Sequence, residues 1–202
     1  MKKGATMAII VDKEEKRRSI ALSCRALLLE HGINSLTVSQ IAQTAGIGKG
    51  TVYEYFSNKE DIVFEIIASF IEEHEMQLKE IAKREIPTKE KILSFYFLFF
   101  DDESSRKQLR TYREFIAISM THPTEQIIAF SQACNSRISA ISREIIEEAI
   151  ARGELKPEAR EIIRHLAVYH TGLIVEEQKS ALEARSEIEA FLDALFTLME
   201  KK

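Results

Sequence analysis

The sequence predicts an all-α protein, and three observations support this prediction. Apolar residues recur at spacings of three and four along nearly the whole chain, which is the period of a helix with one buried face. The 202 residues include only 7 glycines and 3 prolines, fewer than the recurrent turns of a many-stranded sheet require. No segment alternates apolar and polar residues as a half-buried strand does. We therefore expect a small N-terminal head of three helices and a larger C-terminal helical bundle, with about nine helices in all.

The first three predicted helices are recognised by their ends. Residues 13–31 carry an apolar stripe that closes at Gly32, a typical C-terminal stop. Residues 37–44 form the second helix, with Thr37 as its N-cap, and residues 48–55 form the third.

Six further helices complete the prediction. The fourth begins at Ser57 or Asn58, has acidic residues in its first turn and ends before Pro87. Residues 95–100 would be apolar on all sides of a helix, so we expect the helix that contains them to be surrounded by other helices. The last five helices are predicted at residues 89–100, 103–121, 124–152, 157–180 and 186–199.

The composition indicates a globular chain, and we expect it to stay in the cytoplasm. It is 45% hydrophobic and 30% charged, and no apolar run approaches the ~20 residues of a membrane span. The apolar stretch near the N-terminus is too short for a secretory signal. Cys24 and Cys134 both lie in apolar helical patterns, so we expect buried thiols in a reducing compartment rather than a disulfide.

The most informative segment is residues 37–56, TVSQIAQTAGIGKGTVYEYF. Two short helices cross steeply only if the crossing residue is small and the turn tolerates an unusual backbone. Ala42 supplies the small residue, and Gly46 supplies the turn four positions later. This pattern predicts a helix-turn-helix. The alternative is an ordinary helical hairpin in which the glycines only mark the turn.

The outward face of the third helix carries the groups that DNA accepts. It offers a cation, hydroxyl groups and bare backbone, from Gly48, Lys49, Gly50, Thr51, Tyr53 and Tyr55. Taken singly, either tyrosine is also consistent with a half-buried core position, and Lys59 with a solvated surface lysine. Together they favour a DNA-binding surface.

The charge is distributed unevenly along the chain. The net charge of −4 does not by itself indicate a nucleic-acid partner. Residues 1–60 nevertheless hold nine Lys and Arg against six Asp and Glu, a balance of +3, which leaves −7 for residues 61–202. A basic head on an acidic body places positive charge where a polyanion would bind.

At this point a family resemblance is evident. Residues 13–66 resemble the DNA-binding head of the tetracycline-repressor (TetR) family of bacterial transcription regulators, through the stretch TVSQIAQTAGIGKGTVYEYFSNKEDI. The resemblance implies that phosphates are contacted by Thr37, Ser39 and Lys59. It implies that Lys49, Gly50 and Thr51, preceded by Gly48, approach the major groove. It also implies that the side chains of Tyr53 and Tyr55 pack against the DNA backbone.

Two residues depart from the family pattern. Gly48 stands where many members have a serine or threonine cap, so the recognition helix lacks a capping bond worth at most ~1 kcal/mol. Glu54 stands where many members have an aromatic residue or histidine. Its carboxylate either faces solvent, which we prefer, or accepts a hydrogen bond from cytosine N4.

The resemblance implies that residues 61–202 form a ligand-binding and dimerisation domain. Two copies of the last two helices would form a four-helix seam and place two recognition segments on a palindromic operator, with half-sites ~34 Å apart. The alternative is that both helices complete the core of one chain. The predicted interface residues are Ile162, Leu166, Tyr169, Leu173, Ile188, Phe191, Leu192, Leu195, Leu198 and Met199.

A ligand pocket is expected among the aromatic residues of the middle helices. The composition favours an apolar or amphipathic small molecule, and the family resemblance implies that this ligand releases the DNA. Each candidate taken singly is also consistent with plain core. The candidates are Phe95, Phe99, Tyr112, Phe115, Phe130, Cys134 and Tyr169.

Catalytic and metal chemistry find no support in the sequence. The five histidines form no i, i+4 pair, and no phosphate-binding glycine loop or nucleophile elbow is present. We therefore expect neither an enzyme nor a bound cofactor or metal. The predicted function is a homodimeric, ligand-responsive repressor, with activation as an open possibility. The alternative is an all-helical ligand-binding or protein-interaction module without specific DNA binding.

Overall fold

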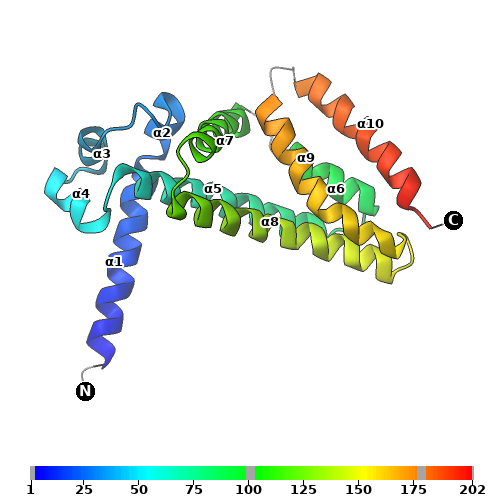
Figure 1. Cartoon of the computed structure of the whole chain (residues 1–202). Helices are drawn as coiled ribbons and strands as arrows, with labels where there is room; N and C mark the ends of the chain where they lie inside the picture. Colours follow the sequence, from blue (N-terminus) through cyan, green and yellow to red (C-terminus); the bar gives the residue numbers. More distant parts are fainter. Residues whose placement is uncertain (1–2, 99–102, 177–180, 202) are drawn as a thin grey trace. The chain divides into compact units, whose positions relative to one another are not determined.

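The structure is all-α, as predicted. It is a computed structural model that describes residues 3–98, 103–176 and 181–201, with side chains for residues 13–98, 105–176 and 183–201. These residues form ten α-helices and one 3₁₀ helix, joined by short connections (Figure 1). The helices are α1 (Lys3–Ser23), α2 (Arg25–His31), α3 (Val38–Ala45), α4 (Lys49–Tyr55), α5 (Lys59–Ala82), α6 (Thr88–Phe97), α7 (Glu103–Thr121), α8 (Glu125–Ala151), the 3₁₀ helix η1 (Pro157–Ile162), α9 (Ile163–Glu176) and α10 (Ala181–Met199).

Two predicted helices are interrupted in the structure. The first is divided at Cys24, whose amide donates to the Ala21 carbonyl at 3.0 Å, a tighter turn than the α-helix makes. The helix predicted from residue 157 begins instead as the 3₁₀ helix η1, with Pro157 in its first turn, and becomes α-helical at Ile163. The apolar periodicity continues across both interruptions, which is why the sequence pattern does not reveal them.

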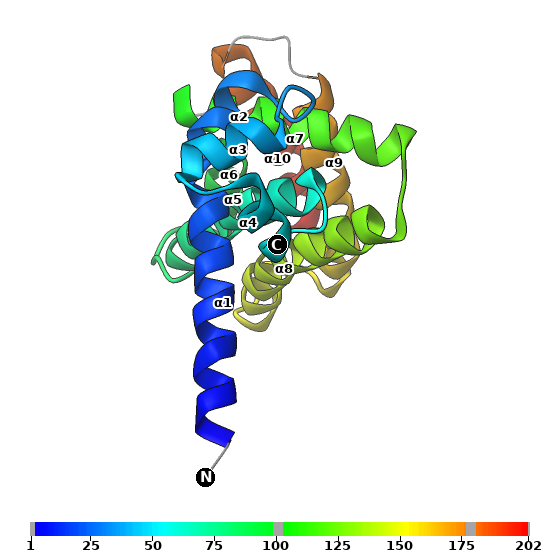
Figure 2. The same cartoon turned by 90° about the vertical axis from the view of Figure 1, so that its left-hand side faces the viewer.

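The chain divides into two compact units, Met1–Phe70 and Ile71–Lys202, so that the division falls within α5. The first unit contains α1 to α4 and the first half of α5. Its core is built from side chains that are at most 4% exposed: Ile20, Leu28, Ile33, Leu36, Ile41, Val52, Phe56, Ile62 and Ile66. Figure 2 looks onto α3 and α4 of this unit. The functional boundary that we predict after residue 60 stays a prediction.

The turn between α3 and α4 has the geometry that the sequence predicts. Gly46 adopts the left-handed conformation, with φ 66° and ψ 31°, and its amide donates to the carbonyls of Ala42 and Gln43. At the other end of α3, Thr37 and Gln40 form a capping box, because each side chain bonds the backbone amide of the other. Both ends of α3 are therefore fixed by local hydrogen bonds.

In the second unit, α6 packs between α8 and α10, and α9 packs against α7 and α8. In the run 95–100, Phe95, Tyr96 and Phe97 of α6 are buried, as expected of an enclosed helix, whereas residues 99–100 lie outside the described residues. The Tyr96 hydroxyl donates to the Leu166 carbonyl of α9 at 3.0 Å. None of the described helices combines the length and the apolar character that crossing a membrane requires.

Candidate nucleic-acid interface

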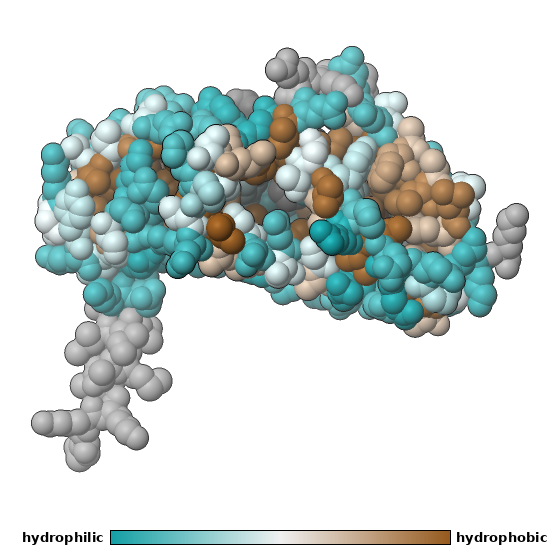
Figure 3. All heavy atoms as spheres, viewed as in Figure 1, coloured by the Kyte–Doolittle hydropathy of each residue, from teal (hydrophilic) through white to brown (hydrophobic). Residues whose placement is uncertain are grey.

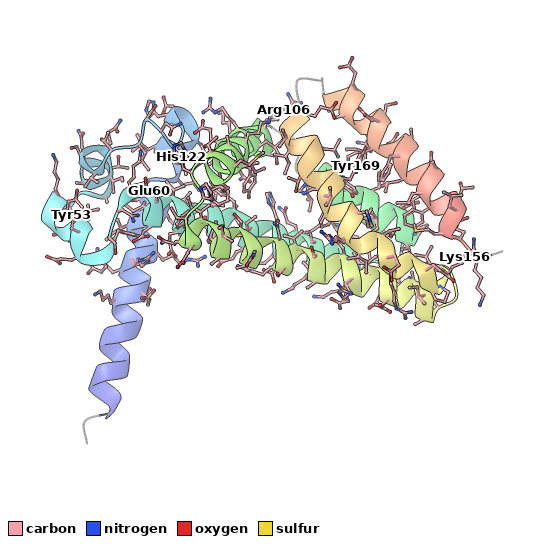
Figure 4. All side chains as sticks on the ribbon, in the orientation of Figure 1. Tyr53, Glu60, Arg106, His122, Lys156 and Tyr169 are labelled. Atoms are coloured by element: carbon pink, nitrogen blue, oxygen red, sulfur yellow. The ribbon has the colours of Figure 1, made fainter. Side chains whose placement is uncertain are left out.

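The exposed surface of α4 is the centre of the candidate interface. Val52 points inward and is 1% exposed, whereas Lys49 and Gly50 are exposed and Tyr53 is 60% exposed. In Figure 4 the labelled Tyr53 extends from α4 into open space. This short helix thus buries one side chain, Val52, and presents a cation, bare backbone and a phenol on its other side.

The start of α4 has no side-chain cap. Gly48 is the N-cap, with φ −73° and ψ 152°, and makes no side-chain capping bond. The amides at the start of α4 therefore remain available to an anion, which the helix dipole also favours. Thr51 is half-buried in the next turn.

The start of α3 gives its two predicted phosphate contacts different environments. The hydroxyl of Thr37 donates to Gln40 Oε1 at 2.7 Å and accepts from the Gln40 amide at 3.3 Å. Its proton is thus used inside the capping box. Ser39 is exposed in the first turn of the helix, so it is the better placed of the two to donate a hydroxyl proton to a phosphate.

Tyr55 and Lys59 lie at the edge of the same surface and are both half-buried. The Lys59 ammonium is 3.5 Å from the carbonyl oxygens of Ile33 and Asn34, in the loop before α3. An ammonium carries three protons, so one further acceptor can be bound. Glu54 is exposed on α4, and both of its readings, solvent or base contact, remain open.

One residue that supports this surface was not found by sequence reasoning. Arg17 of α1 donates from Nη1 to the Tyr55 carbonyl at 3.1 Å and from Nε to Glu65 at 3.1 Å. Its guanidinium also lies 4.7 Å from the centroid of the Phe56 ring. Arg17 therefore joins α1, the C-terminus of α4 and α5. It stands in the basic run Lys16 to Arg18, which reads as a solvated helix face.

These features define the class of protein: a helix-turn-helix DNA-binding domain followed by an all-α domain. Residues 23–66 match the family model described as bacterial regulatory proteins, tetR family. Residues 23–66 therefore form a DNA-binding domain of the tetR family, a family of bacterial transcriptional regulators.

Similar proteins extend the likeness beyond the head. The chain is 23% identical over 144 residues to the uncharacterized HTH-type transcriptional regulator YhgD of Bacillus subtilis, a match that covers 71% of this chain and 73% of that protein. It is 38% identical over 74 residues to the fatty acid metabolism regulator protein of the same organism, but this match covers only 35% of the chain and 38% of that protein.

Solved structures share the fold over nearly the whole chain. A TetR-family regulator from Mesorhizobium loti superposes with a TM-score of 0.73 at 18% identity, covering 94% of this chain and 98% of that one. A transcriptional regulator from Saccharomonospora viridis, solved in complex with choline, superposes with a TM-score of 0.74 at 17% identity, covering 94% and 100%.

The predicted pocket residues fall into two clusters of rings within the second unit. In one, Phe95 contacts Tyr96 at 5.5 Å, and Tyr96 lies 5.7 Å from Tyr169, measured between centroids. Tyr169 also stacks on Phe191 of α10 at 4.1 Å, and Figure 4 shows it on α9.

The other cluster lies on α7 and α8. Phe115 and Phe130 meet edge to face at 5.5 Å, and Tyr112 lies one turn before Phe115. Cys134 is half-buried on α8, and burial raises the pKa of its thiol to about 11. Phe99, the remaining candidate, lies outside the described residues.

A separate hollow of about 740 Å³ lies where α5 ends, near the start of α6 and the end of α8, and none of the predicted pocket residues lines it. Its lining carries charges of both signs, several in ion pairs such as Arg152 with Glu148 and Glu154. The described residues hold no group of three or more His, Cys, Asp or Glu side chains that could hold a metal ion.

The predicted interface residues of α9 and α10 divide by exposure. Five are enclosed by their own chain and have little area left for a partner: Leu166, Leu173, Ile188, Leu192 and Met199. Ile162, Tyr169, Phe191 and Leu195 are half-buried, and Leu198 is 72% exposed.

The outward faces of these two helices contain apolar residues that sequence reasoning missed. On α9, Val168 and Val175 are 62% and 57% exposed, with the exposed Gly172 between them. On α10, Ala190 and Ala194 are exposed beside Leu198. Figure 3 shows hydrophobic residues gathered over α10.

Proposed function

We propose that the protein is a homodimeric repressor that binds a palindromic operator and is released from it by a small apolar or amphipathic ligand. The single observation that supports this proposal most strongly is the exposed surface of α4, with Lys49, Gly50 and Tyr53 beside an uncapped helix start. A cation, bare backbone and a phenol are groups through which proteins contact the phosphates and groove edges of DNA.

Dimerisation is supported by the apolar residues on the outward faces of α9 and α10. Exposed Val168, Val175 and Leu198 form part of a surface that a second copy of the same pair of helices would cover. Gly172 has open space around its α-carbon, which allows close approach of a partner helix. A two-fold dimer presents two copies of α4, so the operator should contain two half-sites in inverted orientation, with their centres about one turn of the DNA helix apart.

Ligand control is supported by the two ring clusters in the second unit and by the choline bound to the similar regulator from S. viridis. A ligand that binds better to one arrangement of the dimer shifts the population toward it. If the distance between the two α4 helices in that arrangement no longer matches the spacing of the operator half-sites, the operator is released.

The experiment is a gel-shift titration with duplexes from the region around the gene. We expect Lys49→Ala to weaken operator binding by about ten- to one-hundredfold, since a base-edge contact contributes ~1–3 kcal/mol. Tyr53→Ala should also weaken operator binding, because it removes a contact to the DNA backbone. The matched control is Lys83→Ala, which removes an exposed lysine of the second unit. Unchanged affinity in both α4 variants would show that this surface does not contact DNA.

Lys59 provides an independent measurement. If its ammonium holds a phosphate, Lys59→Ala should weaken all duplexes alike and reduce the slope of log affinity against log salt by about one. A weaker operator complex with an unchanged slope would instead assign Lys59 to the loop carbonyls of Ile33 and Asn34 alone.

A further inference from the structure

A band of polar side chains crosses the interior of the second unit. We call Gln108, Tyr112, His74 and His170 the polar band. Gln108 and Tyr112 lie one turn apart on α7 and therefore share a face. Gln108, Tyr112 and His74 are 5%, 6% and 4% exposed, and the ring centroids of Tyr112 and His74 are 6.3 Å apart. The band therefore runs from α7 to α5 through buried positions.

His170 of α9 continues the band to α6. Its ring contacts those of Phe95 and Tyr96, with centroid distances of 5.5 and 5.9 Å. Burial, together with a smaller effect of the nearby His74, lowers the pKa of His170 to about 4. The His170 imidazole is therefore uncharged at neutral pH, and the band contains no Asp, Glu, Lys or Arg.

Gln108 is the most informative member of the polar band. Its Oε1 atom is enclosed, and no residue that the structure describes donates a hydrogen bond to it. A buried acceptor without a donor destabilises a protein, whereas an apolar side chain of the same size at that position would not. The glutamine therefore indicates a donor from outside the described residues.

The surroundings of the band are aromatic. Phe115 follows Tyr112 on α7 and meets Phe130 edge to face, while Phe95 contacts His170. Flat faces and edges of this kind favour another ring, which can stack or pack edge-on. A ligand here would combine an aromatic body with a hydrogen-bond donor, and a charged group would be disfavoured by burial.

We propose that the polar band binds the polar end of a small, uncharged aromatic molecule with a hydrogen-bond donor, which Gln108 Oε1 accepts. The proposal rests on the ligand control proposed above and narrows its ligand from apolar or amphipathic to a phenol-like class. The binding event itself does not require the operator, so it can be measured separately.

The test is calorimetric titration of the full chain at neutral pH with phenol, toluene and benzoate. Phenol should bind about two- to tenfold more tightly than toluene, which has no donor, because one neutral hydrogen bond contributes ~0.5–1.5 kcal/mol. Benzoate should bind more weakly than phenol, since its carboxylate is charged and carries no donor. Gln108→Leu should reduce phenol affinity to that of toluene and leave toluene affinity unchanged.

Two further variants make the result decisive. Gln77→Leu makes the same substitution at an exposed position of α5 and should change none of the three affinities. Gln108→Met, with an unbranched side chain, has the same expected result as Gln108→Leu and serves if the leucine variant does not fold.

The proposal is overturned if phenol does not bind, if phenol and toluene bind equally, or if Gln108→Leu or Gln108→Met leaves phenol affinity unchanged. If phenol does not bind, or binds no more tightly than toluene, the hydrogen-bond donor to Gln108 Oε1 would instead be an enclosed water. A parallel gel shift separates the two proposals. Phenol that binds through Gln108 without releasing the operator supports the polar band and contradicts ligand control by this site.

Discussion

Among single residues, Gly46 carries the clearest conformational demand. Its φ of 66° lies in the left-handed region, where a β-carbon costs about 1 kcal/mol or more. No other atom lies within 4 Å of the position that a β-carbon would take, so the cost comes from the backbone alone. We expect Gly46→Ala to lower the free energy of unfolding by about 1 kcal/mol, measured by urea denaturation.

Gly50 provides the matched control for this prediction. It also has open space around its α-carbon, but it lies inside α4 with ordinary helical backbone. Gly50→Ala should therefore raise the free energy of unfolding by ~0.5–1 kcal/mol. Equal changes in the two variants would contradict the account of Gly46. If the backbone of Gly50 approaches the major groove, the same variant should also weaken operator binding.

Predictability from sequence differs among residues for a physical reason. The roles of Thr37 as a cap and Gly46 as a turn depend on backbone contacts within a few positions, and the sequence predicts both correctly. The partners of Arg17 are 38 and 48 positions away, at Tyr55 and Glu65. A long basic side chain looks the same whether it is solvated or bonded to a distant carbonyl, so its role could not be predicted.

Among elements, α4 depends on α1 and α5 for its position. It has seven residues, too few for an isolated helix in water to be stable. Val52 anchors one face, and Arg17 ties the carbonyl of Tyr55 at its C-terminus to α1 and, through Glu65, to α5. A cation at a helix C-terminus is also favoured by the helix dipole.

We therefore expect Arg17→Met to weaken operator binding about tenfold, because the C-terminus of α4 loses its fixed position. Arg17→Lys keeps the positive charge but not the forked donors of the guanidinium, so its operator affinity should lie between those of the wild type and Arg17→Met. Lys16→Met, an exposed neighbour on α1, is the control. Affinities are measured by gel shift, and thermal unfolding reports any loss of folded protein.

Glu65→Gln distinguishes positioning from direct contact with DNA. If Arg17 acts by holding α4, loosening its ion pair with Glu65 should also weaken the operator complex. If Arg17 instead contacts a phosphate, removing a nearby negative charge should strengthen the complex. A higher affinity in Glu65→Gln would therefore contradict the positioning role.

The helices α9 and α10 show where helical periodicity stops being informative. A stripe of apolar residues predicts that a helix has a buried face, but not whether its own chain or a partner covers it. Here α10 packs on α6 and its Ile188 and Leu192 are buried, whereas Leu198 remains exposed. Small residues such as Gly172 are not counted as apolar anchors, although they permit close packing. The tertiary arrangement was needed to separate the two faces.

At the scale of the whole molecule, operator affinity should depend on dimerisation. Joining two heads makes the second half-site contact intramolecular, which raises affinity by ~10²–10⁴ without any new contact. A change in the second unit that separates the two copies should therefore weaken operator binding as strongly as a change in α4 itself. The net charge of −7 on residues 61–202 gives no attraction to DNA that could compensate.

Val168→Glu tests this dependence. The Val168 side chain is 62% exposed on α9, so a carboxylate at this position is well solvated in the single chain. If a second copy covers this position, the carboxylate is buried without a positive charge to pair with, which opposes dimerisation. We expect light scattering to show that the variant is monomeric, and its affinity for the operator to fall by ~10²-fold or more. Its unfolding temperature should equal that of a dilute wild-type sample. Met120→Glu, which places the same charge on a 77% exposed residue of α7, should remain dimeric and bind the operator normally. A dimeric Val168→Glu with full operator affinity would place the interface elsewhere on the chain, and monomeric protein in both variants would show that added negative charge, rather than the α9 face, prevents association.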